Sequence, residues 1–169
     1  MGAHPYFYFT PYQKDIQAAL QALREREFQA GRYDPAMGMA DPPSYMFQMR
    51  FPPDQTWPTP GAQHASIEEA IDASEESGTG SILDLSRVGS APDFCTVCPL
   101  DDQDLIRLFG TTKPTRELLE GALINPKPDS RHEAADLFWE RIGRGEGRYI
   151  VIYSGTEPRE LFFVGYSID

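Results

Sequence analysis

Apolar residues gather in two runs close to the end of the chain, separated by turn-forming residues. The first run is Tyr149–Tyr153 and the second is Leu161–Ile168, and both are rich in β-branched and aromatic side chains. Residues 154–160 between them include glycine and proline. This pattern predicts two antiparallel strands joined by a loop. Because the first run is apolar at every position, it predicts a central strand that is covered on both faces.

The N-terminal region combines a strand pattern with a helix pattern. Tyr6–Phe9 is an aromatic run that predicts a strand. Thr10 suits a helix N-cap and Pro11 suits the first helical position. Apolar side chains then recur at helical spacing until Gly31, which is a typical C-terminal stop. We therefore expect a helix over residues 11–30.

The middle of the chain predicts shorter elements linked by loops. Strands are expected at residues 44–50, 81–85 and 94–98. Helices are expected from Ser66 to Gly78, from Asp101 to Gly110, from Pro114 to just before Asn125, and from Ser130 to the glycines that begin at Gly143. Ser66 and Ser130 each open a capping box, with Glu69 and Glu133 as its second residue, and Asp101 is the expected cap of its helix. Residues 51–63 hold four prolines and Trp57, which predicts a surface loop. A connection of that length is either flexible or functional.

The order of these elements indicates the fold class. A doubly wound sheet would alternate regularly between strand and helix, and this chain does not. We therefore expect an α+β fold, with a mainly antiparallel or mixed sheet, about five helices packed on it, and the C-terminal hairpin at its centre. A chain of 169 residues can bury a sizeable core, so residues 1–169 are expected to form a single domain.

The charge of the chain narrows the classes of partner. The formal net charge is −11 at pH 7. Such a field repels phosphate backbones and anionic lipid, so neither nucleic acid nor a membrane is an expected partner, whereas a basic protein is favoured. No apolar run approaches the length of a membrane span, and the N-terminus lacks the pattern of a signal peptide. A cytoplasmic location is therefore expected, and the oligomeric state stays open.

The helix predicted from Ser66 concentrates acidic residues without any Lys or Arg. Its acidic residues are Glu68, Glu69, Asp72, Glu75 and Glu76. Three of them lie in the C-terminal half, where the helix dipole disfavours anions, and mutual repulsion adds to that cost. Two explanations stay open: an ordinary solvated face, or a surface for a basic partner.

A second acidic patch consists of Asp101, Asp102 and Asp104. Neither this patch nor the acidic helix has the spacing of an EF-hand calcium loop.

Cys95 and Cys98 have the spacing of a CxxC motif. A redox pair needs its first thiol at a helix N-terminus, and the helix expected here begins near Asp101, beyond both sulfurs. A structural zinc site needs four ligands, and the chain has no second CxxC. On a strand, the two side chains point to opposite faces. The favoured interpretation is two buried or half-buried thiols, with redox and metal roles as alternatives. No cofactor is expected.

Other stretches resemble catalytic motifs only in part. Gly78–Ser81 has the composition of a phosphate-binding loop, but such loops follow a strand and open a helix, and this stretch follows a helix. A turn is therefore the favoured interpretation. His132 and Glu133 begin a zinc-protease motif, but Asp136 stands where the second histidine belongs. No catalytic residue is assigned.

Two functional hypotheses follow. The first is an acidic protein-binding domain, such as an inhibitor or immunity-type protein, that masks a basic surface with the acidic residues between 66 and 77. The alternative is a small enzyme or ligand-binding protein whose site is assembled from scattered Tyr, His and carboxylate residues, with 51–63 as a lid. Its pocket walls would come from Tyr6, Tyr8, Tyr12, Tyr33, Tyr45 and Trp57.

Overall fold

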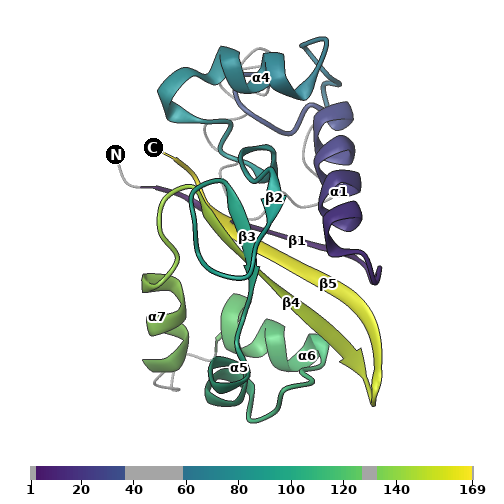
Figure 1. Ribbon diagram of the computed structural model, residues 1–169, viewed down its shortest axis with the longest axis vertical. Coiled ribbons are helices and arrows are strands. Elements are labelled where there is room, and N and C mark those ends of the chain that lie inside the picture. The colour runs from purple at the N-terminus through teal and green to yellow at the C-terminus, as the bar shows by residue number, and fades with distance from the viewer. Residues whose placement is uncertain (1–2, 37–58, 127–132, 169) are drawn as a thin grey trace.

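A computed structural model describes residues 3–36, 59–126 and 133–168 and contains a five-stranded sheet in that part of the chain. The strands are β1 (Pro5–Pro11), β2 (Arg87–Val88), β3 (Thr96–Pro99), β4 (Glu146–Ser154) and β5 (Glu157–Tyr166). Their order is β1-β5-β4-β3-β2 (Figure 1). Because β4 pairs antiparallel with β5 and parallel with β3, the sheet is mixed. The C-terminal hairpin is central, as predicted.

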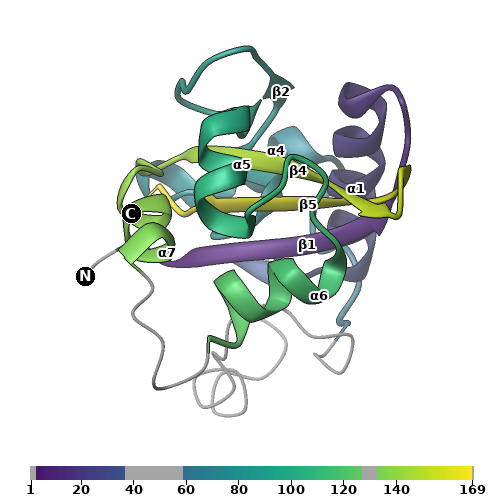
Figure 2. The ribbon, with the colours of Figure 1, turned by 90° about the horizontal axis from the view of Figure 1, so that it is seen from below.

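Helices cover both faces of the sheet. The α-helices of the described residues are α1 (Ile16–Ala30), α4 (Ile67–Ser74), α5 (Asp102–Phe109), α6 (Arg116–Leu119) and α7 (Glu133–Glu140). Short 3-10 helices span Glu75–Ser77 and Ile82–Asp84, and a π-helical turn, Glu120–Ile124, follows α6. Helices α1 and α4 lie on one face, and α5, α6 and α7 lie on the other (Figures 1 and 2). The predicted α+β class is confirmed.

Alternating side chains of the strands divide the core between these two faces. On β5, Leu161 and Phe163 pack with residues of α1, whereas Phe162 and Val164 pack with residues of α6 and α7. All four side chains are fully buried. Burying one such side chain is worth about 1.5–3 kcal/mol, so the hairpin contributes to both halves of the core.

A pair of glycines makes room for a core side chain at the centre of the sheet. Gly147 of β4 is the register partner of Gly165 of β5. A Cβ atom at Gly147 would run into Leu85 Cδ1, and one at Gly165 would lie 2.8 Å from Tyr6 Cε2. The missing side chains therefore let Leu85 pack directly against the backbone of the hairpin.

The N-terminal helix begins later than the cap signal predicted. β1 continues through Thr10 to Pro11, where these residues pair with β5. Asp15 is the actual N-cap, and its Oδ1 accepts a hydrogen bond of 2.9 Å from the amide of Ala18. Pairing with β5 therefore outweighs the local cap signal. The C-terminal stop at Gly31 is confirmed, with the glycine in the left-handed region.

Several other boundaries differ from the prediction. The predicted loop over residues 154–160 shrinks to a tight turn, because Glu157–Glu160 continue the strand. The predicted strand at 81–85 is wrong, since the 3-10 helix Ile82–Asp84 takes its place and buries its apolar side chains. The helix expected from Pro114 is capped by Thr115. The predicted strand at 44–50, the cap at Ser130 and most of the 51–63 loop lie outside the described residues.

Candidate functional site

The acidic residues between 66 and 77 lie on α4 and the 3-10 helix that continues it. Ser66 caps α4, and its hydroxyl accepts a hydrogen bond of 3.2 Å from the amide of Glu69. Glu69 Oε2 accepts in turn from the amide of Ala65 at 3.1 Å. The predicted capping box therefore forms, with its return bond one residue earlier than usual. All five acidic side chains are exposed to solvent.

These five carboxylates have no cationic partner among the described residues, where no Lys or Arg forms an ion pair with them. The nearby Arg24 is buried and donates instead to Gln21 Oε1 and to the carbonyl of Leu83. The pKa of Glu68 is lowered by its own backbone amide, by the Ser66 hydroxyl and, to a smaller extent, by Arg24. These interactions favour the ionised form of Glu68.

The backbone is strained at the end of this acidic segment. Glu75 follows α4 with φ 53° and ψ −140°, a conformation that L-residues rarely adopt. Such a conformation costs on the order of 1–3 kcal/mol and persists only where the surrounding structure enforces it. The last turn of α4 contains no basic residue to offset the helix dipole. The acidic segment is therefore maintained at a local cost in stability.

Two of the three acids in the second acidic patch form hydrogen bonds or ion pairs with other residues of the chain. Asp101 caps α5, and its Oδ1 accepts from the amide of Asp104 at 2.8 Å. Asp104 Oδ1 accepts from Arg107 Nη1 at 2.7 Å and from Arg141 Nη1 at 3.2 Å. Of the three acids in this patch, only Asp102 has no such role among the described contacts.

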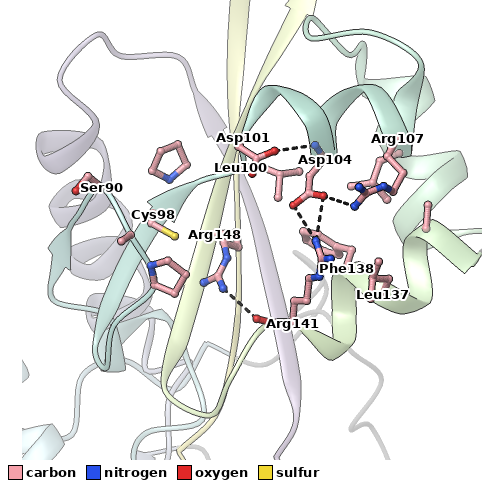
Figure 3. Close-up of a pocket in the computed structure, with 15 residues that line it drawn as sticks. Ser90, Cys98, Leu100, Asp101, Asp104, Arg107, Leu137, Phe138, Arg141 and Arg148 are labelled. Carbon is pink, nitrogen blue, oxygen red and sulfur yellow. Dashed lines mark hydrogen bonds and ion pairs between the residues drawn. The ribbon is translucent and has the colours of Figure 1, made fainter.

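A cavity of about 420 Å³ lies next to this patch, between β3, α5 and α7 (Figure 3). Its apolar wall includes Leu108, Leu137 and Phe138. Arginines from three different elements reach it: Arg107 from α5, Arg141 from the end of α7, and Arg148 from β4. The cavity therefore combines apolar surface with three arginines and two carboxylates, those of Asp101 and Asp104.

Arg148 is the most deeply placed of these arginines, with 8% of its side chain exposed. Its Nη1 donates to the carbonyl of Gly147 at 2.9 Å, and its Nη2 donates to the carbonyl of Arg141 at 3.0 Å (Figure 3). Glu146 Oε2 lies 3.3 Å from Nη2. These contacts hold the guanidinium against the wall beside Cys98 and connect β4 to the end of α7.

The two cysteines have separate surroundings, but they do not share a strand as predicted. β3 begins at Thr96, so Cys98 lies on the strand, whereas Cys95 lies in the turn before it with φ 55°. The pKa of the Cys95 thiol is raised by burial and then by Asp84. The pKa of the Cys98 thiol is raised by burial, which outweighs the opposing effect of Arg148. A redox pair needs a lowered thiol pKa, so the redox interpretation loses its support. Within the described ranges, no group of three potential metal ligands occurs.

Gly78–Ser81 forms a turn that is already occupied by a carboxylate of the same chain. The amide and the hydroxyl of Thr79 both donate to Asp84 Oδ1, at 2.8 and 2.7 Å. Burial raises the pKa of Asp84, although these hydrogen bonds act in the opposite direction. Because the polar groups of Thr79 are directed to Asp84, they are not directed to a phosphate.

The tyrosines proposed as pocket walls do not gather around one cavity. Tyr6 and Tyr33 are buried in the core on the α1 side, and Tyr12 packs at its edge. Tyr8 is buried there as well and contributes to the wall of a shallow groove along β1. Tyr33 donates to or accepts from His64 Nδ1 at 2.8 Å. Tyr45 and Trp57 lie outside the described residues.

Sequence reasoning missed the arginine-lined cavity. Arg107 is distant in the chain from Arg141 and Arg148, and the three arginines show no regular spacing. The one available signal was Arg148, a charged residue directly before the apolar run of the central strand.

The sequence matches no known family model, and comparisons with curated proteins and with solved structures found no match either. Among the described residues, no helix has both the length and the apolar character that a membrane crossing requires.

Proposed function

We propose that this chain is a protein-binding domain that masks a basic surface of another protein, as inhibitors and immunity-type proteins do. The observation that carries the proposal is the acidic face, defined as Glu68, Glu69, Asp72, Glu75 and Glu76. These side chains are exposed and have no cationic partner within the described part of the chain.

The distribution of arginines supports this proposal. Some acids elsewhere in the described structure pair with arginines of the same chain, as in Arg87 with Asp93, Arg116 with Glu120 and Arg159 with Glu157. Others, such as the acids of α7, are also exposed and form no ion pair among the described residues. The acidic face lacks such compensation although it holds five carboxylates within nine residues. A basic partner would supply the missing cations and relieve both the mutual repulsion and the unfavourable interaction with the helix dipole.

The expected mode of binding is electrostatic steering. Complementary charge accelerates the encounter of two proteins, and dissolved salt screens that effect. The acidic face should therefore act mainly on the association rate. Arg or Lys residues of the partner would then form charge-assisted hydrogen bonds with the carboxylates.

A charge-matched pair of variants tests the proposal. In the test variant, Glu68→Gln, Asp72→Asn, Glu75→Gln and Glu76→Gln neutralise the face and leave the capping residue Glu69 intact. In the control variant, Glu117→Gln, Glu133→Gln, Asp136→Asn and Glu140→Gln neutralise exposed acids of α6 and α7. Both variants then have a net charge of −7 instead of −11.

The assay is affinity capture from an extract of the organism that makes the protein, followed by association kinetics with the captured protein. We expect the wild type and the control to retain a basic protein that the test variant loses. The association rate should fall as salt increases, with a weaker salt dependence for the test variant. Equal capture by all three proteins, or an association rate that salt does not change, would contradict the proposal.

A further inference from the structure

We infer that the cavity between β3, α5 and α7 binds a small carboxylate with an apolar body, such as an arylacetate. The site is separate from the acidic face, because α4 covers one face of the sheet, and α5 and α7 cover the other (Figures 1 and 2). The inference therefore does not depend on the proposed protein-binding function.

The two arginines at the rim of the cavity have more hydrogen-bond donors than the surrounding carboxylates accept. Arg107 and Arg141 share a single carboxylate, that of Asp104 (Figure 3). The carboxylate of Asp101, which also lines the cavity, is used as the N-cap of α5. A ligand carboxylate would supply further acceptors for the two guanidinium groups.

The geometry of the two guanidinium groups suits a planar anion. In the described contacts, Arg107 and Arg141 reach Asp104 through Nη1 only. The Nε and Nη2 donors of each group are therefore available. Guanidinium groups bind carboxylates through two parallel hydrogen bonds, and this arrangement favours a planar carboxylate. About half of each arginine side chain is exposed, so a ligand can reach it.

The deeper wall of the cavity selects for an apolar body. Leu108, Leu137 and Phe138 line the cavity, together with Pro92 and Pro99. A cavity of about 420 Å³ lies within the range of 300–1,000 Å³ that is typical of small-molecule sites. The cavity also lies at the carboxyl end of β3, where the chain enters α5. Ligands bind frequently at the carboxyl ends of parallel strands.

Arg148 connects two of the elements that form the site. It is almost fully buried and bonds the carbonyl of Arg141, so it fixes the end of α7 relative to β4. It also forms an ion pair with Glu146 at 3.3 Å, so its charge is compensated within the protein. We assign Arg148 as a positioning residue and not as a direct ligand.

Calorimetric titration with phenylacetate tests the inference. Arg107→Leu and Arg141→Leu should each weaken binding by about tenfold or more, since each removes a charge-assisted pair. Arg159→Leu is the matched control, because it removes an exposed, ion-paired arginine outside the cavity. Both test residues are exposed, so the variants should stay folded. The variant with the neutralised acidic face should bind phenylacetate like the wild type, which separates this test from the previous one.

Two further probes define the ligand class. Acetate supplies the carboxylate without the apolar body, and inorganic phosphate supplies an anion of different shape. Both should bind at least about tenfold more weakly than phenylacetate if the apolar wall contributes. The inference would be wrong if phenylacetate showed no saturable binding, if Arg159→Leu weakened it as much as Arg141→Leu, or if phosphate bound equally well.

Discussion

The buried carboxylate of Glu27 offers the most direct test of how the α1 side of the fold is held together. Its side chain is only 1% exposed. Glu27 Oε2 accepts from Arg32 Nε at 2.7 Å, and Oε1 accepts from Arg32 Nη2 at 2.8 Å and from Arg26 Nε at 2.9 Å. Arg32 lies just beyond the end of α1, so this pair fixes the segment that leaves the helix. The perturbation is Glu27→Met, which keeps the volume and removes the charge.

The expected loss follows from the burial of each partner. Arg26 is about half exposed, so its ion pair with Glu27 contributes at most about 1 kcal/mol to the free energy of unfolding. Arg32 is 15% exposed and makes two parallel bonds, and removing one partner from a buried pair costs about 3–5 kcal/mol. We expect Glu27→Met to lower the free energy of unfolding by about 3 kcal/mol. For a chain of this size, that corresponds to a fall in Tm of roughly 6–12 °C.

The assay is chemical denaturation followed by circular dichroism, applied to a double-mutant cycle. Arg32→Met should also destabilise, because it leaves Glu27 buried with Arg26 alone. The double variant should lose less than the sum of the two single losses, since it leaves no buried unpaired charge. The reasoning would be refuted if Glu27→Met cost less than about 1 kcal/mol, or if the two losses were simply additive.

Two further predictions concern the central hairpin and the thiols. Gly147→Ala should lower the free energy of unfolding, measured by urea denaturation, by roughly 1–3 kcal/mol, because the new Cβ would meet Leu85. The control Gly121→Ala, where the new Cβ has open space, should lower it by less than about 1 kcal/mol. Equal effects of the two variants would contradict the role of the glycine pair. Cys95 and Cys98 should both react slowly with a thiol reagent near pH 8 in the folded protein, because their raised pKa values lower the thiolate fraction, and the rates should rise with pH. Reaction of either thiol at the rate seen in the unfolded chain would show that burial does not protect it.

Strong local signals predicted a large part of the fold. The hairpin was evident because two apolar runs flank turn-forming residues, and β4 and β5 occupy the centre of the sheet as expected. The caps at Ser66 and Asp101 were predicted because a side-chain oxygen precedes a helical pattern by a fixed distance, and both form the expected hydrogen bonds.

The errors arose where tertiary contacts outweigh local preference. Thr10 and Pro11 form a plausible helix start, but pairing with β5 keeps them in a strand. Residues 81–85 form a short run with three apolar side chains, and such a run does not distinguish a strand from a buried helical turn. The neighbours that decide the outcome, α1 and the glycine pair, are distant in sequence.

The two candidate sites differed in whether they could be predicted from the sequence. The acidic face was predictable because its residues are adjacent in the chain. The arginine-lined cavity was not, because Arg107, Arg141 and Arg148 meet only after α5, α7 and β4 are in place.

The pairing of β1 with β5 has a consequence for how the protein is made. Tyr6, near the start of the chain, pairs with Gly165, near the end of the described residues. During synthesis, the aromatic side chains of β1 therefore leave the ribosome long before their partner strand exists. Contacts between such distant residues also slow folding, because a large loop must close before they form. The N-terminal strand is thus expected to need protection from premature association until the final hairpin has emerged.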